Sequence, residues 1–392
     1  MSEAATQAPP LVAGRTPEAV VAPASLDELR ELVAERDGRT LVPVAGGTRL
    51  SLGNAPREPF ALVDVRGALA GEVEHEPADL TAVAPAGVTL GELDAQLAAS
   101  GQRLPLDPPH AEDATLGGVL AVGTGGPLRT RHGLPRDFVL GMTVLRADGE
   151  LVKAGGRVVK NVTGYDLMRL WCGSLGTIGI VTSVAVRVLP RVETVDLCFE
   201  VGSLGEGQAL AERLLRADLR PEWLDLTGGD GGWQGVVRLV EGAVPKATEI
   251  AGADFVPGND DAYLAARDLG FGDAEALTLR ASCATSAIAS TAAALEALAP
   301  SRMLVRPLAR EVRATWEGDA VPEADAVAGA VGRLRAGLAE GGGALIAERI
   351  PDALRGTLDT WGRTANPTRM AAVKAAFDPD GRLNAGRFVG GI

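Results

Sequence analysis

The sequence predicts an α+β protein of two or three domains, and three observations lead to this fold class. Its 392 residues are more than a single hydrophobic core usually serves. Short strand patterns and one capped helix alternate within residues 25–84. After Pro190 the composition changes, and short strands alternate with Ala-rich helices instead of glycine loops. Such segregated helices and strands indicate α+β architecture.

The first half contains helices with clear start signals and strands with clear limits. Ser25 and Glu28 form a capping box ahead of apolar positions 29, 32 and 33, and Thr89 starts a second capped helix. Strands are expected over residues 41–44, 61–65 and 80–84. A hairpin is expected across 139–154 with its turn at 147–149, followed by a long strand over 177–189.

The second half is expected to form a separate α+β unit with an antiparallel sheet. Its helices are predicted at about residues 205–216, 285–298 and 324–340. Near the C-terminus, Asn366 and Pro367 are a typical helix start, and a turn at 378–381 leads into residues 383–386.

The composition excludes several classes of function. Hydrophobic residues make up 46% and charged residues 23%, as in ordinary globular proteins. The net charge of −13 argues against a nucleic-acid partner, which would require clustered Lys and Arg. Cys172, Cys198 and Cys283 are too scattered for a disulfide framework or an iron–sulfur cluster. Without a signal-peptide pattern or an apolar run of roughly 18 residues, the sequence predicts a cytoplasmic protein with no transmembrane segment.

Metal and nucleophile sites are also not expected. The three histidines, at positions 75, 110 and 132, do not have the spacing of metal ligands. His110 follows two prolines and is expected to be a loop residue that could touch a cofactor. A Gly-x-Ser-x-Gly nucleophile motif does not occur in the sequence.

The most informative stretch is residues 157–181, which contains glycines at 164, 173, 176 and 179 ahead of an apolar strand. Glycine at this density indicates turns or a close approach of the backbone to a ligand. A flat or anionic ligand, such as a nucleotide cofactor, would fit. The sequence has neither the Gly-Lys-Ser/Thr ending of a phosphate loop nor a Rossmann Gly-x-Gly-x-x-Gly turn.

Two other glycine segments permit either a functional or an ordinary reading. Residues 45–50 follow a strand, and their backbone N–H groups could bind a pyrophosphate together with the Thr48 hydroxyl. Taken without the other segments, however, this loop is better explained as a tight turn. The segments 115–118 and 123–126 precede Arg129 and Arg131, which place two cations next to a glycine loop that something must order. Alternatively, these arginines belong to a solvated charged loop. A cation such as Lys160, Arg157 or Arg387 could lie near a flavin and adjust its reduction potential. Lys160 could instead form an ion pair with Asp166.

Taken in order, these segments resemble FAD-binding oxidoreductases of the vanillyl-alcohol-oxidase or p-cresol-methylhydroxylase type. The matching motifs are Gly-Gly-Thr at 46–48, Pro-Pro-His at 108–110, Thr-Leu-Gly-Gly at 115–118, residues 131–137, Gly-Ser-Leu-Gly-Thr-Ile-Gly at 173–179 and Leu-Asn-Ala-Gly at 383–386. The resemblance covers about residues 15–192 and 366–388. Within this superfamily, residues 156–166 are most similar to the small FAD-binding subunits of bacterial glycolate oxidases. Leu175 also fits these subunits, since the larger subunits and D-lactate dehydrogenase relatives usually have Glu there.

The resemblance implies a two-subdomain FAD-binding domain of the p-cresol-methylhydroxylase type and an α+β cap domain with an antiparallel sheet. The implied divisions are a flexible N-terminus at 1–14, an FAD-binding domain at 15–192 with subdomains at about 15–70 and 71–192, a cap domain at 193–350, and a C-terminal return segment at 351–392.

The resemblance also implies which residues hold the cofactor. The FAD pyrophosphate would be bound by Ala45, Gly46, Gly47, Thr48, Arg49 and Leu50. The pyrophosphate and ribose region would be lined by Thr115, Gly117 and Gly118. The rest of the cofactor would be surrounded by Arg131, Asp137, Ser174, Thr177, Gly179 and Ile180, and Asn384 would approach the isoalloxazine.

Three departures from the family pattern refine these expectations. The first glycine loop lacks the His that carries covalent flavin in many members, so FAD is expected to be non-covalent. The C-terminal Asn-Pro-Gly is Asn384-Ala385-Gly386 here. The 2-hydroxy-acid dehydrogenases of the superfamily use a His-rich, metal-assisted site in the cap, and residues 133–392 contain no histidine. Independent glycolate oxidation by that mechanism is therefore not expected.

The implied function is that of an FAD-binding subunit of a glycolate or related 2-hydroxy-acid oxidase. Its implied partners are a larger catalytic flavoprotein subunit and an iron–sulfur subunit, in the cytoplasm or at the periphery of the inner membrane through those partners. The candidate catalytic residues are Arg131, Lys160 and Arg387. The alternatives are a stand-alone FAD-dependent alcohol or alditol oxidoreductase, a non-catalytic scaffold with a vestigial flavin site, and a nucleotide-sensing module.

Overall fold

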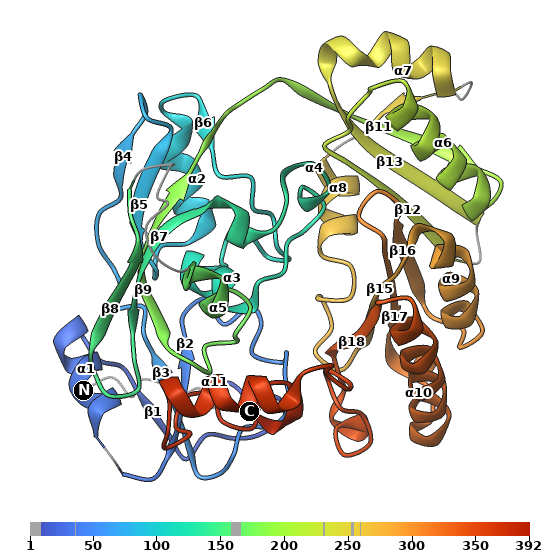
Figure 1. Ribbon diagram of the computed structural model, residues 1–392. Coiled ribbons are helices and arrows are strands. Elements are labelled where there is room, and N and C mark those ends of the chain that lie inside the picture. Colours follow the sequence, from blue (N-terminus) through green and yellow to red (C-terminus); the bar gives the residue numbers. More distant parts are fainter. Residues whose placement is uncertain (1–8, 36, 158–165, 230–231, 252–254, 259) are drawn as a thin grey trace, which may run out of the picture.

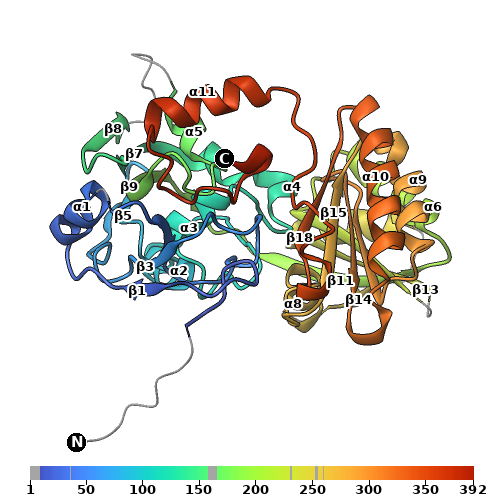
Figure 2. The same ribbon diagram turned by 90° about the horizontal axis from the view of Figure 1, so that it is seen from below.

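The computed structural model describes residues 9–35, 37–157, 166–229, 232–251, 255–258 and 260–392. The chain forms two lobes that face each other (Figure 1). The N-terminal lobe holds the sheets within residues 19–190, and the second lobe, called the cap lobe below, holds the eight-stranded sheet within residues 194–349. Leu354 and Leu358 still pack in the core of the cap lobe, and the helix over 367–377 lies along the N-terminal lobe (Figure 2). The predicted mixed fold with antiparallel sheets is confirmed.

A three-stranded parallel sheet opens the N-terminal lobe, with strand order β1-β3-β2. Its strands are β1 (Ala19–Val21), β2 (Thr40–Val44) and β3 (Phe60–Asp64), and helix α1 (Leu26–Ala34) joins β1 to β2. The Ser25 side chain accepts a hydrogen bond from the backbone N–H of Glu28, as the capping pattern predicted. Leu29 and Val33 of α1 are buried in the core.

A five-stranded antiparallel sheet completes this lobe in the order β4-β5-β9-β7-β8. The strands are β4 (Glu74–Glu76), β5 (Thr81–Pro85), β7 (Val139–Leu145), β8 (Leu151–Gly155) and β9 (Ile180–Arg187). The connecting elements are α2 (Leu90–Ala98), β6 (Gln102–Arg103), α3 (Leu116–Val122), α4 (Arg129–His132), α5 (Met168–Trp171) and β10 (Leu189–Pro190). One hydrophobic core joins both sheets.

The cap lobe is built on an eight-stranded antiparallel sheet in the order β14-β11-β13-β12-β16-β17-β15-β18. The strands are β11 (Thr194–Val201), β12 (Trp223–Gly229), β13 (Gly232–Val240), β14 (Val256–Pro257), β15 (Leu277–Ser282), β16 (Arg302–Arg306), β17 (Glu311–Trp316) and β18 (Ala344–Arg349). The helices are α6 (Leu204–Arg216), α7 (Val244–Ala251), α8 (Asp260–Arg267), α9 (Ile288–Glu296) and α10 (Ala324–Glu340). Helices α6, α9 and α10 cover the sheet face turned away from the N-terminal lobe (Figure 2).

The C-terminal segment is anchored by one buried lysine on helix α11 (Pro367–Phe377). The Lys374 ammonium donates to the carbonyl oxygens of Thr177 at 2.7 Å and Leu383 at 2.8 Å, and to the Asp378 carboxylate at 2.6 Å. All three donors of the ammonium are therefore satisfied inside the protein. The anchor fixes the segment that leads to Asn384 against the glycine turns at 173–179.

Several elements differ from the sequence-based expectations. The predicted strand over 177–189 begins only at Ile180, because the preceding residues form turns with positive φ at Gly173, Gly176 and Gly179. Helix α3 was not predicted, since its first turn contains two glycines, which are poor helix formers. The cap helices α7 and α8 were also missed. Residues 158–165, which include Lys160, lie outside the described residues.

Candidate functional site

The loop after β2 turns sharply at two glycines and presents free backbone donors. A Cβ on Gly46 would lie 2.1 Å from the carbonyl oxygen of Asp113, and Gly47 has a φ of +71°. Both positions therefore require glycine. Within the described part of the chain, no protein acceptor takes the backbone N–H of Gly46, Gly47 or Thr48. Successive free N–H groups of this kind form an anion-binding nest.

Helix α3 packs its first turn closely against the strand end at Ala86. The Thr115 hydroxyl accepts a hydrogen bond from the N–H of Gly118 at 3.3 Å and caps the helix. A Cβ on Gly117 would approach the Ala86 Cβ to 2.8 Å. The glycine thus allows the helix to approach the sheet.

The third segment contains a non-glycine residue in the left-handed region. Leu175 has a φ of 54°, and Asn384, which contacts it, has a φ of 47°. The Asn384 side-chain amide donates to the Leu175 carbonyl at 2.7 Å, and the Leu175 N–H donates to Ala121 at 2.8 Å. Such backbone conformations cost about 1–3 kcal/mol and are held by their surroundings, commonly at functional sites.

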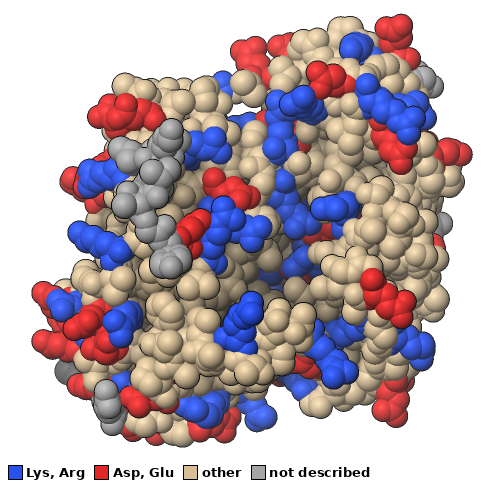
Figure 3. Space-filling model, viewed as in Figure 1, with Lys and Arg blue, Asp and Glu red and all other residues tan. Residues whose placement is uncertain are grey.

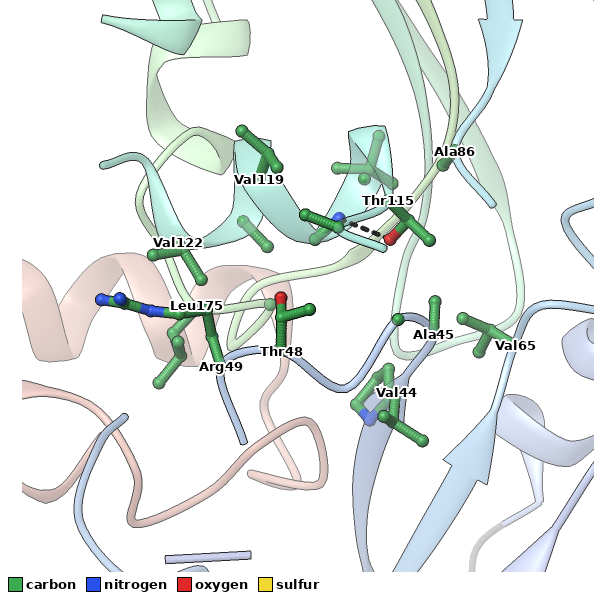
Figure 4. A pocket seen from close by; sticks show the side chains of 18 of the residues that line it. Val44, Ala45, Thr48, Arg49, Val65, Ala86, Thr115, Val119, Val122 and Leu175 are labelled. Atoms are coloured by element: carbon green, nitrogen blue, oxygen red, sulfur yellow. Dashed lines mark hydrogen bonds between the residues drawn. The ribbon is translucent and has the colours of Figure 1, made fainter. Parts of the chain in front are cut away.

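These three segments and the C-terminal return line one cavity of about 990 Å³, open to solvent at its mouth. Figure 4 shows the first glycine loop, with Ala45, Thr48 and Arg49, passing beside Thr115, Val119 and Val122 of helix α3 and its cap. The residues named by the sequence that line it are Ala45, Gly46, Gly47, Thr48, Arg49, Leu50, Thr115, Gly117, Gly118, Gly179, Ile180, Asn384 and Arg387. The walls contain two guanidinium groups and no carboxylate.

Sequence reasoning missed part of the apolar wall. The missed residues include Val65, Leu69, Ala86, Pro108, Val119, Val122, Thr124 and Val181. Some of them follow directly from motifs that had been found, since Val119 and Val122 belong to the helix that Thr115 caps. Others, such as Leu69 and Ala86, carry no local signal because ordinary core residues have the same composition.

Arg387 is a buried cation on the cavity wall. Its guanidinium donates to the carbonyl oxygens of Leu50 at 2.8 Å and Leu52 at 2.6 Å, and to the Asn384 side-chain oxygen at 3.2 Å. No carboxylate pairs with it among the described residues. Burial, together with the charge of Arg355, lowers the pKa of Arg387 to about 10. An anionic ligand in the cavity would offset this cost.

Four of the expected residues do not line the cavity. Arg131 is exposed and donates to the carbonyl oxygen of Arg220 at 2.6 Å. The Asp137 carboxylate accepts from the N–H of Leu134 at 2.8 Å, which fixes a local turn. Ser174 and Thr177 are buried and bond within their own turn: the Thr177 hydroxyl donates to the Ser174 carbonyl at 2.7 Å. The side chains of Asp137 and Thr177 thus stabilise their own turns, and Arg131 contacts the cap lobe.

The two lobes are connected beside the cavity through buried polar contacts. Tyr263 of α8 donates its hydroxyl to Asp107 at 2.9 Å, and the backbone N–H of His110 donates to Asp268 at 3.0 Å. Burial raises the pKa of Asp107 to about 7, against the opposing effect of its hydrogen bonds. A further contact between the lobes is made by the Glu222 carboxylate, which pairs with Arg103 and His132.

Among the helices of the described residues, none has both the length and the apolar character of a membrane span. In that part of the chain, no three His, Cys, Asp or Glu side chains gather as a metal site would require.

Comparison with known proteins gives matches of sequence and of fold. Residues 17–155 match the family model described as an FAD binding domain. The chain is 38% identical to glycolate oxidase subunit GlcE of Escherichia coli (strain K12) over 202 residues, which are 48% of this chain and 53% of that protein. It is 34% identical to glycolate oxidase subunit GlcD of Bacillus subtilis (strain 168) over 180 residues, covering 45% of this chain and 38% of that protein.

A D-lactate dehydrogenase of Archaeoglobus fulgidus is 34% identical over 191 residues, covering 47% of this chain and 42% of that protein. The chain thus spans about half the length, or less, of these curated relatives. Among solved structures, an alkyldihydroxyacetonephosphate synthase superposes with a TM-score of 0.69 over 94% of this chain and 77% of its own length. At 14% identity, this similarity concerns the fold alone.

Proposed function

We propose that this chain is a non-covalent FAD-binding subunit of a complex that oxidises glycolate or a related 2-hydroxy acid. The match of residues 17–155 to an FAD binding domain supports the predicted similarity to the p-cresol-methylhydroxylase superfamily. The observation that carries the proposal is the single cavity formed by the three glycine segments and the C-terminal return. The similarity to glycolate oxidase subunits supports the choice of substrate class.

The residues of the cavity fit such a cofactor. The free N–H groups at 46–48 suit the pyrophosphate, and the apolar wall suits flat rings. A side chain at position 46 would collide with the Asp113 carbonyl oxygen, so the loop requires glycine there. The described residues that line the cavity include no His, Cys or Tyr that could form a covalent flavin bond. This supports non-covalent binding.

The protein's own residues would bind and orient the cofactor rather than carry out the reaction. When bound, FAD supplies an acceptor for the hydride lost from the substrate C–H bond. Arg49 and Arg387 would place positive charge beside it, and the apolar wall would exclude water. The cap lobe contains no histidine for the proton-accepting role that a 2-hydroxy acid requires. We therefore assign turnover to a complex with a larger flavoprotein subunit and an iron–sulfur subunit, located in the cytoplasm.

The test is to purify the chain alone and together with its two proposed partners, then to count flavin and to measure glycolate-dependent dye reduction. We expect about one FAD per chain, released into the supernatant on acid precipitation, and dye reduction only with the partners. Flavin that stays with the precipitated protein would contradict non-covalent binding. A chain that stays colourless with excess FAD would support the scaffold alternative. Alditol turnover by the chain alone would support the stand-alone alternative.

A further inference from the structure

A separate cavity, the α2–α8 cavity, lies between residues of helix α2 in the N-terminal lobe and helix α8 in the cap lobe. It encloses about 830 Å³, including its open mouth, and it shares no described lining residue with the cavity proposed for FAD. One segment of the chain separates the two cavities. Asp107, Ala111 and Glu112 line the α2–α8 cavity, whereas Pro108 and Ala114 line the FAD cavity. A ligand in the α2–α8 cavity would therefore contact a segment that also shapes the FAD cavity.

The three arginines that line the α2–α8 cavity are each paired with a carboxylate. Arg191 donates to both oxygens of Asp94 at 2.6 Å. Arg267 donates to the two oxygens of Glu112 at 2.9 and 3.0 Å. Arg103 likewise pairs with a carboxylate of the cap lobe. The positive charges of this cavity are thus neutralised by the protein itself.

Asp107 is a lining carboxylate without a paired cation in the described part of the chain. Its Oδ2 accepts from the Leu128 N–H and the Tyr263 hydroxyl, both at 2.9 Å, whereas its Oδ1 is buried and has no described hydrogen-bond partner. The side chain is 5% exposed, and burial raises its pKa to about 7 although Arg306 and Arg267, which pair with other carboxylates, act against this. A buried carboxylate is costly unless a cation pairs with it.

The rest of the wall offers apolar surface for a short chain. Leu93, Leu104, Leu106 and Leu128 line the cavity and are buried in the protein. One unpaired carboxylate beside hydrocarbon surface suits an alkyl chain that ends in a cationic nitrogen. Figure 3 shows the opposite charge balance in the hollow between the lobes, where Lys and Arg side chains gather. Such a positively charged hollow repels a small cation.

We propose that the α2–α8 cavity binds a small primary amine as its ammonium ion, which donates to Asp107 Oδ1 while its alkyl chain lies against the leucines. The ammonium supplies the cation that Asp107 lacks, and its hydrogen bond to the carboxylate is charge-assisted. The inference does not rest on the proposed function, because the described residues that line this cavity are separate from those of the FAD cavity.

The test titrates the full chain, with and without FAD, with n-butylammonium chloride and measures binding by calorimetry. The controls n-butanol and butyrate have a similar chain length but carry no positive charge. We expect the ammonium to bind, and both controls to bind at least about tenfold more weakly, because neither offers a charged donor. Equal binding of the ammonium and the alcohol, or no binding of the ammonium, would overturn the proposal.

Asp107→Asn removes the charge at Oδ1, while its amide oxygen can still accept from Leu128 and Tyr263. It should weaken n-butylammonium binding roughly 10- to 100-fold, as expected for the loss of a charge-assisted hydrogen bond. Asp79→Asn is the matched control, since Asp79 is an exposed aspartate that lines neither cavity, and it should leave binding unchanged.

Ala111→Leu is a second variant, which fills part of the cavity and leaves every charge in place. It should weaken n-butylammonium binding about tenfold, because the added side chain takes the space of the alkyl chain. Urea unfolding shows whether each variant folds, and Ala111→Leu decides if Asp107→Asn does not. Folded variants that bind the ammonium within twofold of wild type would overturn the site.

The pH dependence of binding is the last readout, because the ammonium requires an ionised Asp107. The charged or titratable groups that face Asp107 are Tyr263 and Arg267 on α8 and Arg306 on β16, and the pKa of each is raised, so none changes charge between pH 6 and 8. With a pKa of about 7 for Asp107, wild type should bind n-butylammonium roughly tenfold more weakly at pH 6 than at pH 8. Wild-type binding that is equal at both pH values would contradict the assignment of Asp107.

Discussion

Substitution of Gly46 by alanine tests whether the first glycine loop shapes the cofactor cavity. The added Cβ would lie 2.1 Å from the Asp113 carbonyl oxygen, whereas real Cβ contacts essentially never fall under 3.0 Å. The loop and the Asp113 backbone must therefore separate by about 1 Å, and forced displacements of this kind cost about 1–3 kcal/mol. The neighbour is backbone, so it cannot rotate away as a side chain would.

The displacement occurs at the residues whose N–H groups would bind the pyrophosphate. If the loop relaxes when FAD is absent, the full free energy of the displacement is lost from FAD binding. Gly46→Ala should then weaken the affinity for FAD roughly 5- to 150-fold. The assay is titration of apo-protein with FAD, followed by the quenching of flavin fluorescence. Urea unfolding of the apo-variant shows how much of the cost appears instead as lost stability.

Gly356→Ala is the matched control, because a Cβ at Gly356 would meet nothing within 4 Å and its φ is not positive. Its FAD affinity should equal that of wild type. A Gly46→Ala protein that binds FAD within twofold of wild type, with an unchanged unfolding midpoint, would refute the reasoning. The loop would then be an ordinary turn, the reading its sequence alone favours.

Two further predictions concern the cavity wall and the contact between the lobes. Asn384→Ala leaves the Leu175 carbonyl and an Arg387 donor without partners and places alanine at a φ of 47°. The substitution should therefore lower the free energy of unfolding, measured by urea titration, by roughly 2–4 kcal/mol. An unchanged unfolding midpoint would count against this prediction. Burial raises the pKa of Asp107 from 3.8 to about 7, so the folded chain keeps a proton that the unfolded chain releases, and stability should fall as the pH rises from about 4 to 7 and then level off. Relative to Asp107→Asn, wild type should lose up to roughly 4 kcal/mol over that window, measured by urea unfolding at several pH values. A flat difference would mean that Asp107 stays ionised.

The sequence was most informative where a motif acts through its own backbone. The family resemblance assigned Gly46 and Gly117 to a cofactor site, whereas the glycines alone favoured a tight turn at Gly46. The structure shows at both positions a close backbone approach that leaves no room for a side chain. Thr115 shows the limit of this reasoning. The sequence analysis predicted no helix after it, whereas the structure forms helix α3 there and uses Thr115 as the N-cap. Packing against Ala86 overrides the weak helix propensity of glycine there.

The sequence was least informative about the charges between the lobes. Arg49 and Glu348 lie 299 positions apart, and Arg129 and Glu311 lie 182 apart. Each residue alone reads as a solvated surface charge, which is where most Arg and Glu residues are found. Only the folded chain shows that they are buried and paired. For the same reason Arg131, next to a glycine loop in sequence, was a natural candidate, yet it points to Arg220 on the surface.

Arg49 connects the two parts of the site that the sequence treats separately. Its backbone belongs to the first glycine loop, and its guanidinium pairs with Glu348 at 3.1 Å and stacks on the Phe271 ring at 4.5 Å, both in the cap lobe. Any movement of the cap strands that carry Glu348 must therefore either break this buried pair or pull on the loop that lines the FAD cavity. Breaking a buried ion pair costs about 3–5 kcal/mol, more than the roughly 1–3 kcal/mol of a strained loop. The loop is thus the weaker element, and the position of the cap lobe and the shape of the cofactor cavity are set together.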